Sequence, residues 1–300
     1  MKISRKKFLK TVTAIGSAIA MKSRIFGAIQ TAMDNGAEFP PVVWLQGQGC
    51  TGCSVSLLNS ITCSSIDNLL LNTISMEYHP NLSAAAGELA ADGIEAAFAR
   101  GNYILVIEGA VPAGEAGDYC HIWDGMTILQ AVQTYAPAAA AILAVGTCAA
   151  YGGIPGSAPD PTSALSVQET LSLYNINNAL INLPGCPAHP DWVVGTIAGL
   201  LDGIFPSLDS YKRPRQFYKK TVHSSCPNRG LPRAGRLGEA GCLLNLGCKG
   251  QWTYADCPSR KWNSDLGDAA GVNWCIGAKF PCQGCTEPDF PDGKLPFFLP

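Results

Sequence analysis

The sequence predicts an α/β protein in which a doubly wound parallel sheet is followed by an irregular, cysteine-rich region. Short apolar runs alternate with helix-like segments over residues 42–201, which is typical of a parallel sheet covered by helices. Seven of the 13 cysteines then lie between Cys226 and Cys285, in a stretch that is rich in Gly and Pro and has little periodicity. The charge balance changes between the same two regions, so we expect two parts with different roles.

Five apolar runs are the predicted strands, at 42–46, 69–75, 103–107, 140–145 and 179–183. Their continuous hydrophobicity fits strands that are buried on both faces. The predicted helices are 83–100, 124–135, 163–174 and 191–201. Five strands with this alternation predict a flavodoxin-like core.

Charge divides the chain into three segments. Residues 1–32 carry seven Lys/Arg and no acid, residues 33–211 carry sixteen Asp/Glu and one base, and residues 212–300 carry thirteen bases and seven acids. We expect an export signal over 1–32, a flavodoxin-like domain over 33–211 and a cysteine-rich domain over 212–300. No continuous basic patch supports nucleic-acid binding. The charged fraction of only 15% predicts a surface that a partner covers.

The N-terminal segment has the pattern of an export signal. A basic stretch precedes a small-residue apolar stretch over 11–21, which is too short to span a membrane. Residues 4–10, Ser-Arg-Lys-Lys-Phe-Leu-Lys, resemble the twin-arginine signal Ser-Arg-Arg-x-Phe-Leu-Lys, with Lys6 replacing the second arginine. An amphipathic N-terminal helix is the alternative. Since no later stretch has 18 uninterrupted apolar residues, we expect a periplasmic chain with no membrane span after cleavage, attached to a membrane only through a partner.

Cysteines follow three of the predicted strands. Cys50 and Cys53 follow the first strand, Cys148 the fourth and Cys186 the fifth. Because ligands of such sheets bind beyond the carboxyl ends of the strands, these four thiols are predicted to converge. Glycines beside each cysteine let the backbone approach a bulky ligand and leave amides free to bond sulfur. The pattern favours a metal cluster over a bare ion or a thioredoxin-type pair.

The C-terminal region offers eight further ligands, which make two sites of four. The first set combines one imidazole with three thiols, and the second has four thiols: His223, Cys226, Cys242 and Cys248, then Cys257, Cys275, Cys282 and Cys285. Zinc would accept either set, and disulfides are a further alternative for an exported chain. The many nearby bases suit anionic thiolate clusters, whose charge they offset.

Longer motifs resemble a known family. Residues 44–58, Trp-Leu-Gln-Gly-Gln-Gly-Cys-Thr-Gly-Cys-Ser-Val-Ser-Leu-Leu, look like the proximal-cluster motif of the small subunit of nickel–iron hydrogenases. The motifs at 108–112, 146–153, 183–187 and 246–250 resemble family motifs in family order. Asn273-Trp274-Cys275 and the segment 287–294 are most similar to the periplasmic nickel–iron–selenium branch.

This resemblance implies three [4Fe–4S] clusters in a line. The implied ligands are Cys50, Cys53, Cys148 and Cys186 for the proximal cluster, His223, Cys226, Cys242 and Cys248 for the distal one, and Cys257, Cys275, Cys282 and Cys285 for the medial one. Many relatives have Pro at the position of Cys275 and carry a three-iron medial cluster, so a fourth thiolate here implies four irons. Oxygen-tolerant relatives have extra cysteines where this chain has Gly52 and Gly153, which implies a plain four-thiolate proximal cluster.

The same resemblance implies the electron-transfer subunit of a hydrogenase, an oxidoreductase whose nickel–iron site splits H2 on a partner large subunit. No residue of this chain then acts as a catalytic acid, base or nucleophile. Electrons leave near His223 for a periplasmic carrier such as a multihaem cytochrome c. The alternatives are an iron–sulfur subunit of a quinone-linked respiratory complex that does not use H2, and a zinc or disulfide protein. The remaining Cys63 and Cys120 are predicted to be small buried hydrophobes.

Overall fold

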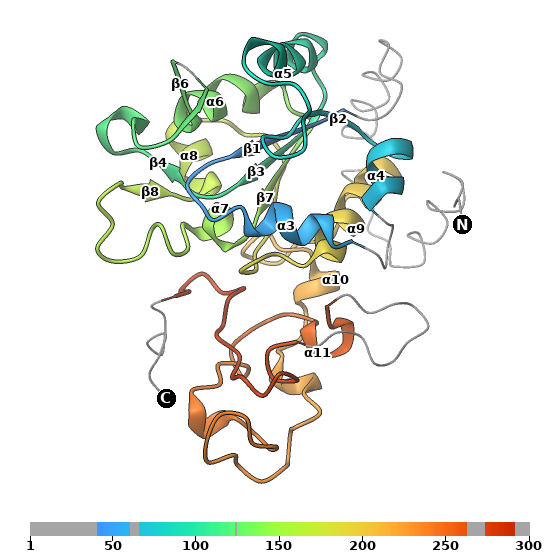
Figure 1. The fold of residues 1–300 in the computed structure, drawn as a ribbon, viewed down its shortest axis with the longest axis vertical. Helices are drawn as coiled ribbons and strands as arrows, with labels where there is room; N and C mark the ends of the chain where they lie inside the picture. Colours follow the sequence, from blue (N-terminus) through green and yellow to red (C-terminus); the bar gives the residue numbers. More distant parts are fainter. Residues whose placement is uncertain (1–40, 61–65, 124, 263–273, 292–300) are drawn as a thin grey trace.

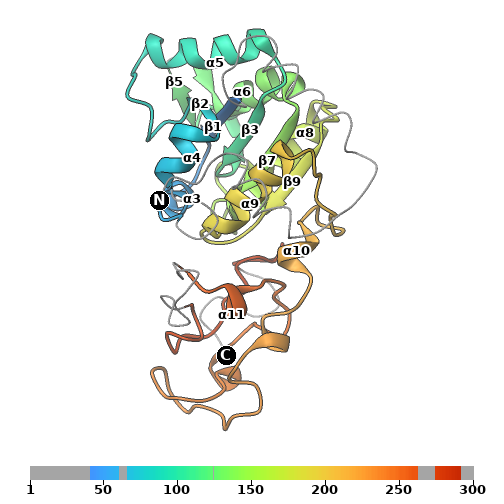
Figure 2. The same ribbon diagram turned by 90° about the vertical axis from the view of Figure 1, so that its right-hand side faces the viewer.

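The computed structural model describes residues 41–60, 66–123, 125–262 and 274–291. The predicted export signal over 1–32, Cys63, Asn273 and the last residues of the 287–294 motif lie outside the described residues. Two parts follow one another along the long axis of the molecule (Figure 1). The larger part holds a sheet between helices, and the smaller part holds most of the C-terminal cysteines (Figure 2).

The sheet is parallel and has the strand order β2-β1-β3-β7-β9. This order matches the flavodoxin-like arrangement that the sequence predicts. The strands are β1 Pro41–Gln46, β2 Ser75–Tyr78, β3 Ile104–Glu108, β7 Ala141–Val145 and β9 Leu180–Leu183. Gln46, Glu108, Val145 and Leu183 pair in one row across the sheet. Four strands therefore end level, and the loops that follow them start side by side.

The predicted strand over 69–75 is wrong. Residues Ile66–Asn72 form the helix α4, and the strand β2 begins only at Ser75. Leu69 is buried whereas Leu71 is 72% exposed, so only one side of this apolar run meets the core, as in a helix. A short apolar run does not distinguish a helix from a strand, and the edge strand β2 is too polar to stand out in the sequence.

Helices cover both faces of the sheet. One face packs against α3 (Gly52–Leu58), α4 and α9 (Pro190–Leu201), and the other against α5 (Glu88–Arg100), α6 (Ile128–Tyr135) and α8 (Val167–Leu173) (Figure 2). Alternate residues of each strand supply the two cores: Val42 and Trp44 face the first set of helices, and Val43 and Leu45 the second. The continuous apolar strands are therefore buried on both sides, as predicted.

Local capping explains where two of the helices begin. Thr127 caps α6 with Gln130, and Ser166 caps α8 with Glu169, each pair forming a reciprocal capping box. The remaining small elements of this part were not predicted from the sequence. These are α7 (Thr147–Tyr151), η2 (Gly114–Gly117), η3 (Ala136–Ala138), the pair β4 (Val111–Pro112) and β8 (Ala164–Leu165), and the pair β5 (His121–Trp123) and β6 (Met126–Thr127).

The C-terminal part contains only short helices among its described residues: α10 (Arg215–Tyr218), η4 (His223–Ser225), η5 (Leu244–Leu246) and α11 (Cys257–Arg260). Its buried side chains, such as Leu243 and Ile276, belong to the same core cluster as one face of the sheet. Trp192 Nε1 donates a 2.9 Å hydrogen bond to Asp256 Oδ1 across the junction. None of the described helices has the length and apolarity to span a membrane.

Candidate functional site

The four predicted proximal cysteines meet at the carboxyl edge of the sheet. Cys50 and Cys53 flank the start of α3 after β1, Cys148 lies in α7 after β7, and Cys186 follows β9. Burial is the main cause of the raised pKa of Cys53 and of Cys186. Repulsion between thiolates adds to it, from Cys148 and Cys186 on Cys53 and from Cys50 on Cys186. Cys53 is buried whereas Cys50 and Cys186 are exposed, so the site is open on one side.

Glycines make the space around these sulfurs. A Cβ atom at Gly146 would lie 2.6 Å from Cys53 Sγ, and one at Gly153 would lie 3.1 Å from Cys148 Sγ. Both glycines have positive φ angles, of +88° and +56°, which few other residues adopt without strain. A Cβ at Gly52 would lie 3.0 Å from Cys50 Sγ. The donor set and the backbone around it therefore fit a bulky group that is held by four sulfurs.

Burial disfavours bare thiolates at this edge. Burial, and then repulsion from Cys186, raises the pKa of Cys148 to about 11. Burial also raises the pKa of Cys53, with a second contribution from the carboxylate of Glu108. Iron would supply the positive charge that stabilises the thiolate forms, because metal ions deprotonate the thiols that bind them.

Glu108 is a buried carboxylate at the centre of this edge. It ends β3, between the strands that carry Cys53 and Cys148, and only 4% of it is exposed. Its two oxygens accept hydrogen bonds from Trp44 Nε1, Gln46 Nε2, the Cys53 and Ser54 backbone N–H groups, and Ser54 Oγ. Its motif was recognised in the sequence, but no role was predicted for the carboxylate. The available signal was an acid at the end of an otherwise apolar strand.

His79 extends this network. Its Nδ1 accepts the Asn81 backbone N–H at 3.1 Å, so Nε2 carries the proton and donates to Ser54 Oγ at 3.2 Å. Ser54 Oγ in turn donates to Glu108 Oε2. Burial lowers the pKa of His79 to about 4. The imidazole is therefore neutral, and its hydrogen bonds give it a structural role.

The four predicted medial cysteines also gather. Repulsion from Cys257, Cys282 and Cys275 adds to burial in raising the pKa of Cys285. Burial raises the pKa of Cys282 to about 12, and this thiol shares a 3.5 Å hydrogen bond with Thr253 Oγ1. The structure therefore brings these four side chains together in the C-terminal part.

Direct contacts join the medial group to the proximal group. Burial raises the pKa of Cys285, and the Cys186 backbone N–H opposes this shift. Thr147 Oγ1 donates to the Cys285 carbonyl and accepts the Gly185 N–H at 2.9 Å. One proximal loop residue thus contacts one medial cysteine directly. The role of Thr147 was not predicted from the sequence.

The predicted distal ligands line one small cavity. His223, Cys226, Cys242 and Cys248 are joined there by Arg229 and Ile276, among others. Arg233 Nη1 donates a hydrogen bond to Cys242 Sγ. Repulsion from Cys248 contributes to the raised pKa of Cys275 and of Cys282. The distal and medial groups are therefore neighbours as well.

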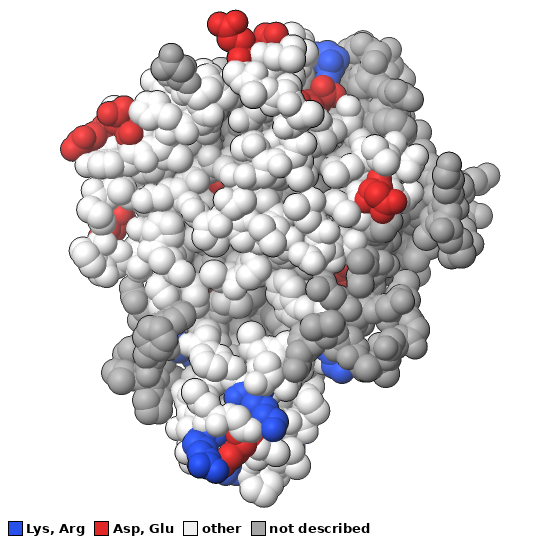
Figure 3. Space-filling view, in the orientation of Figure 1, with Lys and Arg blue, Asp and Glu red and all other residues white. Residues whose placement is uncertain are grey.

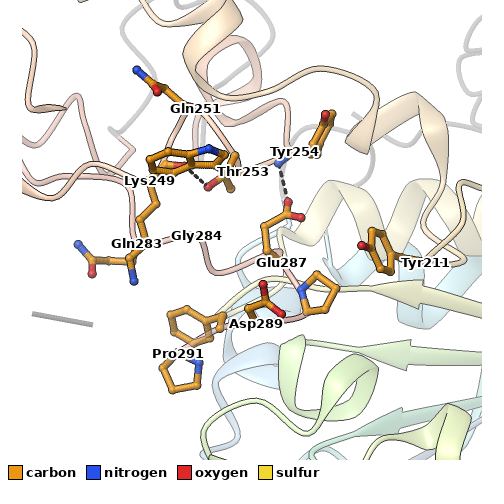
Figure 4. Close-up of a pocket in the computed structure, with 13 residues that line it drawn as sticks. Tyr211, Lys249, Gln251, Thr253, Tyr254, Gln283, Gly284, Glu287, Asp289 and Pro291 are labelled. Atoms are coloured by element: carbon orange, nitrogen blue, oxygen red, sulfur yellow. Dashed lines mark hydrogen bonds between the residues drawn. The ribbon is translucent and has the colours of Figure 1, made fainter. Parts of the chain in front are cut away.

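A larger pocket of about 300 Å³ lies beside the medial cysteine loop. Figure 4 shows Glu287 in its wall, where it accepts the Tyr254 backbone N–H at 2.6 Å. Arg213 Nη1 donates to the same carboxylate oxygen at 3.1 Å. None of the twelve predicted ligands lines this pocket. Through Glu287, this wall of the pocket is hydrogen-bonded to Tyr254 and Arg213 in earlier parts of the chain.

Other thiol chemistry receives no support from the described residues. The twelve cysteines among them are all free thiols. No three His, Cys, Asp or Glu side chains in the described part of the chain are arranged to hold a single metal ion. Cys120 is half-buried, and burial raises its pKa.

The fold and the site define a class: a cysteine-rich electron-transfer subunit with a flavodoxin-like domain. Residues 50–200 match the model of the NADH ubiquinone oxidoreductase 20 kDa subunit, and residues 218–298 match that of the C-terminal region of NiFe/NiFeSe hydrogenase small subunits. The chain is 40% identical to the periplasmic [NiFeSe] hydrogenase small subunit of Desulfomicrobium baculatum, over 100% of this chain and 99% of the relative. It is 36% identical to the periplasmic [NiFe] hydrogenase small subunit 1 of Nitratidesulfovibrio vulgaris, over 99% of this chain and 93% of the relative.

Solved structures agree. The reduced, active Ni-Fe-Se hydrogenase of Desulfomicrobium baculatum superposes with a TM-score of 0.81 and 40% identity, over 87% of this chain and 99% of that one. The chain therefore belongs to the family of nickel–iron and nickel–iron–selenium hydrogenase small subunits. It is the electron-transfer subunit of an oxidoreductase whose active site lies on a partner large subunit. Relatives along the whole chain, together with the C-terminal match, favour this over the quinone-linked alternative.

Proposed function

We propose that this chain relays electrons between the nickel–iron site of its large subunit and an external carrier through three [4Fe–4S] clusters. Cys50, Cys53, Cys148 and Cys186 hold the proximal cluster, and Cys257, Cys275, Cys282 and Cys285 hold the medial one. His223, Cys226, Cys242 and Cys248 hold the distal one. Each cluster, when bound, accepts and donates single electrons at a potential set by its ligands and hydrogen bonds.

The order of the three groups carries this proposal. Thr147, next to Cys148, donates a hydrogen bond from its Oγ1 to the Cys285 carbonyl, which joins the proximal group to the medial group. The backbone N–H of Lys249, next to Cys248, donates a 2.7 Å hydrogen bond to the Cys282 carbonyl, which joins the distal group to the medial group. These contacts support a series that runs from the proximal group at the sheet edge through the medial group to the distal group. A series of this kind suits stepwise electron transfer better than three independent structural metals.

The chain's own residues shape each end of this series. Exposed Cys50 and Cys186 open the proximal group to the large subunit, which covers them in the heterodimer. The network of Glu108, Ser54 and His79 fixes the Cys53 loop and keeps water from its buried side. Arg233 donates to Cys242 at the other end and offsets thiolate charge there.

The cellular setting follows from the sequence motifs. Residues 1–32 direct export by a twin-arginine-type route, which carries folded proteins with their clusters already inserted. The domains are 33–211, with the proximal cluster, and 212–300, with the medial and distal clusters. The exported heterodimer works in the periplasm and passes electrons to a carrier such as a multihaem cytochrome c.

Iron and sulfide analysis of the purified heterodimer tests the proposal. We expect about thirteen Fe per heterodimer, which is four for each of three cubanes in this chain and one in the nickel–iron site, with about twelve acid-labile sulfides. Zinc in place of iron, or thiols without metal, would contradict it. Replacing Cys120 by Ala is the matched control, because this cysteine lies outside all three ligand sets and the iron content should not change.

A further inference from the structure

The distal end of the molecule carries an exposed patch of mixed basic and apolar side chains. We call it the distal-end patch, and its members are Arg229, Leu231, Arg233, Arg236, Leu237 and Lys279. Leu231 is 48% exposed and Leu237 56%. Figure 3 shows Lys and Arg gathered at this lower end of the molecule.

Two members of the patch lie at the predicted distal site. Arg229 lines the same cavity as His223 and Cys226. Arg233 donates a hydrogen bond to Cys242 Sγ. The Gly238 N–H approaches the Lys279 carbonyl at 3.5 Å, which holds Lys279 against the loop that carries Arg236. The basic surface therefore begins at the side chains from which electrons leave.

Most of this positive charge is unbalanced. The patch holds four Lys/Arg, and the only acid within residues 229–241 is Glu239. Glu239 pairs with Arg236 at 2.8 Å, but the Arg236 side chain is 83% exposed, so the pair is weak in water. Among the described residues, no carboxylate lies within ion-pair distance of Arg229, Arg233 or Lys279.

The sheet domain has the opposite charge. Residues 33–211 carry sixteen acids and one base, and Figure 3 shows Asp and Glu over the upper body. An acidic protein is thus repelled from the sheet domain and attracted to the distal end. Such a charge distribution orients a partner before contact and raises its association rate.

The need to offset the negative charge of a bound cluster explains only some of the basic side chains in the patch. Arg233 contacts a predicted ligand and can serve that purpose. Arg236 bonds Glu239 instead, and no hydrogen bond joins the side chain of Arg236 or Lys279 to a described cysteine. The charge of Arg236 and Lys279 therefore does not serve to offset the charge of a thiolate.

We infer that the distal-end patch docks a protein electron carrier whose own redox centre is ringed by Asp and Glu. The inference rests on the proposed function, because it assumes that electrons leave at the distal site. Oxidation of one H2 on the large subunit gives two protons and two electrons, and each docking event reduces one carrier centre by one electron. Leu231 and Leu237 supply the apolar contact at the centre of the interface.

The test uses the iron-loaded heterodimer and two protein probes, an acidic rubredoxin and a basic monohaem cytochrome c. The variant is R236E/K279E, which reverses two charges that lie outside the ligand sets. At low ionic strength we expect roughly tenfold weaker rubredoxin binding and roughly tenfold slower H2-dependent rubredoxin reduction than in the wild type. The difference should vanish at high salt, where exposed charges are screened.

The control is R215E/K219E, which makes the same charge change at α10, near the junction of the two parts (Figure 1). It should bind rubredoxin like the wild type. All three enzymes should exchange H2 with D2O equally, because that reaction needs no electron exit. Equal loss of rubredoxin binding in both variants, or tighter wild-type binding of the basic cytochrome than of rubredoxin, overturns the inference.

The outcomes separate this inference from the proposed function. If the iron-loaded enzyme binds the basic cytochrome more tightly than rubredoxin and reduces it rapidly, only the inference of an acidic carrier is overturned. An iron-loaded enzyme that exchanges H2 with D2O but reduces neither probe at any ionic strength overturns both.

Discussion

The backbone N–H of Cys53 donates a 2.9 Å hydrogen bond to Glu108 Oε1, 55 residues away in the sequence. β3 brings Glu108 to the row in which β1 and β7 also end, so one carboxylate reaches the loop that follows β1. The same oxygen accepts the Ser54 N–H. A single side chain therefore fixes the start of α3, on which Cys53 lies.

Replacing Glu108 by Gln should loosen this loop. A Gln side chain has one acceptor oxygen where Glu108 has two, and its amide N–H groups would face donors. We expect local destabilisation of about 2 kcal/mol, and hence about thirtyfold faster amide exchange of residues 47–58. Hydrogen-exchange mass spectrometry of the heterodimer measures it.

Glu95→Gln is the control for this substitution. Glu95 accepts a hydrogen bond from Tyr135 OH on the opposite side of the sheet, and its loss should leave exchange of residues 47–58 unchanged. Unchanged exchange in Glu108→Gln would show that the carboxylate does not anchor the loop.

Replacing Cys275 by Pro should remove about one Fe from the chain, because three thiolates then remain for a three-iron medial cluster. The thiol of Cys275 adds to the raised pKa of Cys257, Cys282 and Cys285, which places it in this group. Iron analysis and electron paramagnetic resonance measure the change. The same iron content in the variant and the wild type would show that Cys275 binds no iron.

His79 should make the heterodimer less stable in acid. Its pKa is lowered to about 4 in the folded chain and is about 6.5 when unfolded, so protonation favours unfolding. The folded state therefore keeps the full stabilisation by neutral His79 above pH 6.5 and loses it as the pH falls towards 4. We expect a loss of about 2 kcal/mol between pH 7.5 and pH 5. Chemical denaturation of the wild type and of His79→Asn at pH 7.5 and pH 5 measures this loss. An equal pH dependence of the two proteins would show that His79 is not its source.

The central strands of the sheet could be predicted from the sequence, whereas the edge strand could not. The predicted strands at 103–107 and 140–145 lie within one residue of β3 and β7, because both are continuous apolar runs buried on two faces. The predicted strand at 69–75 is wrong because Leu69 and Leu70 lie on the core side of a helix, whereas Leu71 in the same helix is 72% exposed. At the edge of a sheet, the local sequence pattern does not distinguish well between a strand and a helix.

The cysteine groups were predictable because each follows a strand end or forms a spaced pair. Their surroundings depend on long-range contacts that no local pattern encodes. Thr147 reaches Cys285 only because the C-terminal part docks on the carboxyl edge of the sheet. Arg233 was one base among many until its contact with Cys242 distinguished it.

Gly146→Ala should abolish proximal iron binding, because the new Cβ would lie 2.6 Å from Cys53 Sγ, at a backbone φ of +88°. We expect about four Fe fewer in the chain. Backbone strain alone does not explain such a loss, and Gly230→Ala separates the two causes. Gly230 has a φ of +86° with nothing within 4 Å of an added Cβ, so this variant should cost about 1 kcal/mol and keep its iron. Equal iron loss in both variants would attribute the effect to strain, and full iron in Gly146→Ala would show that the proximal thiols do not need this space.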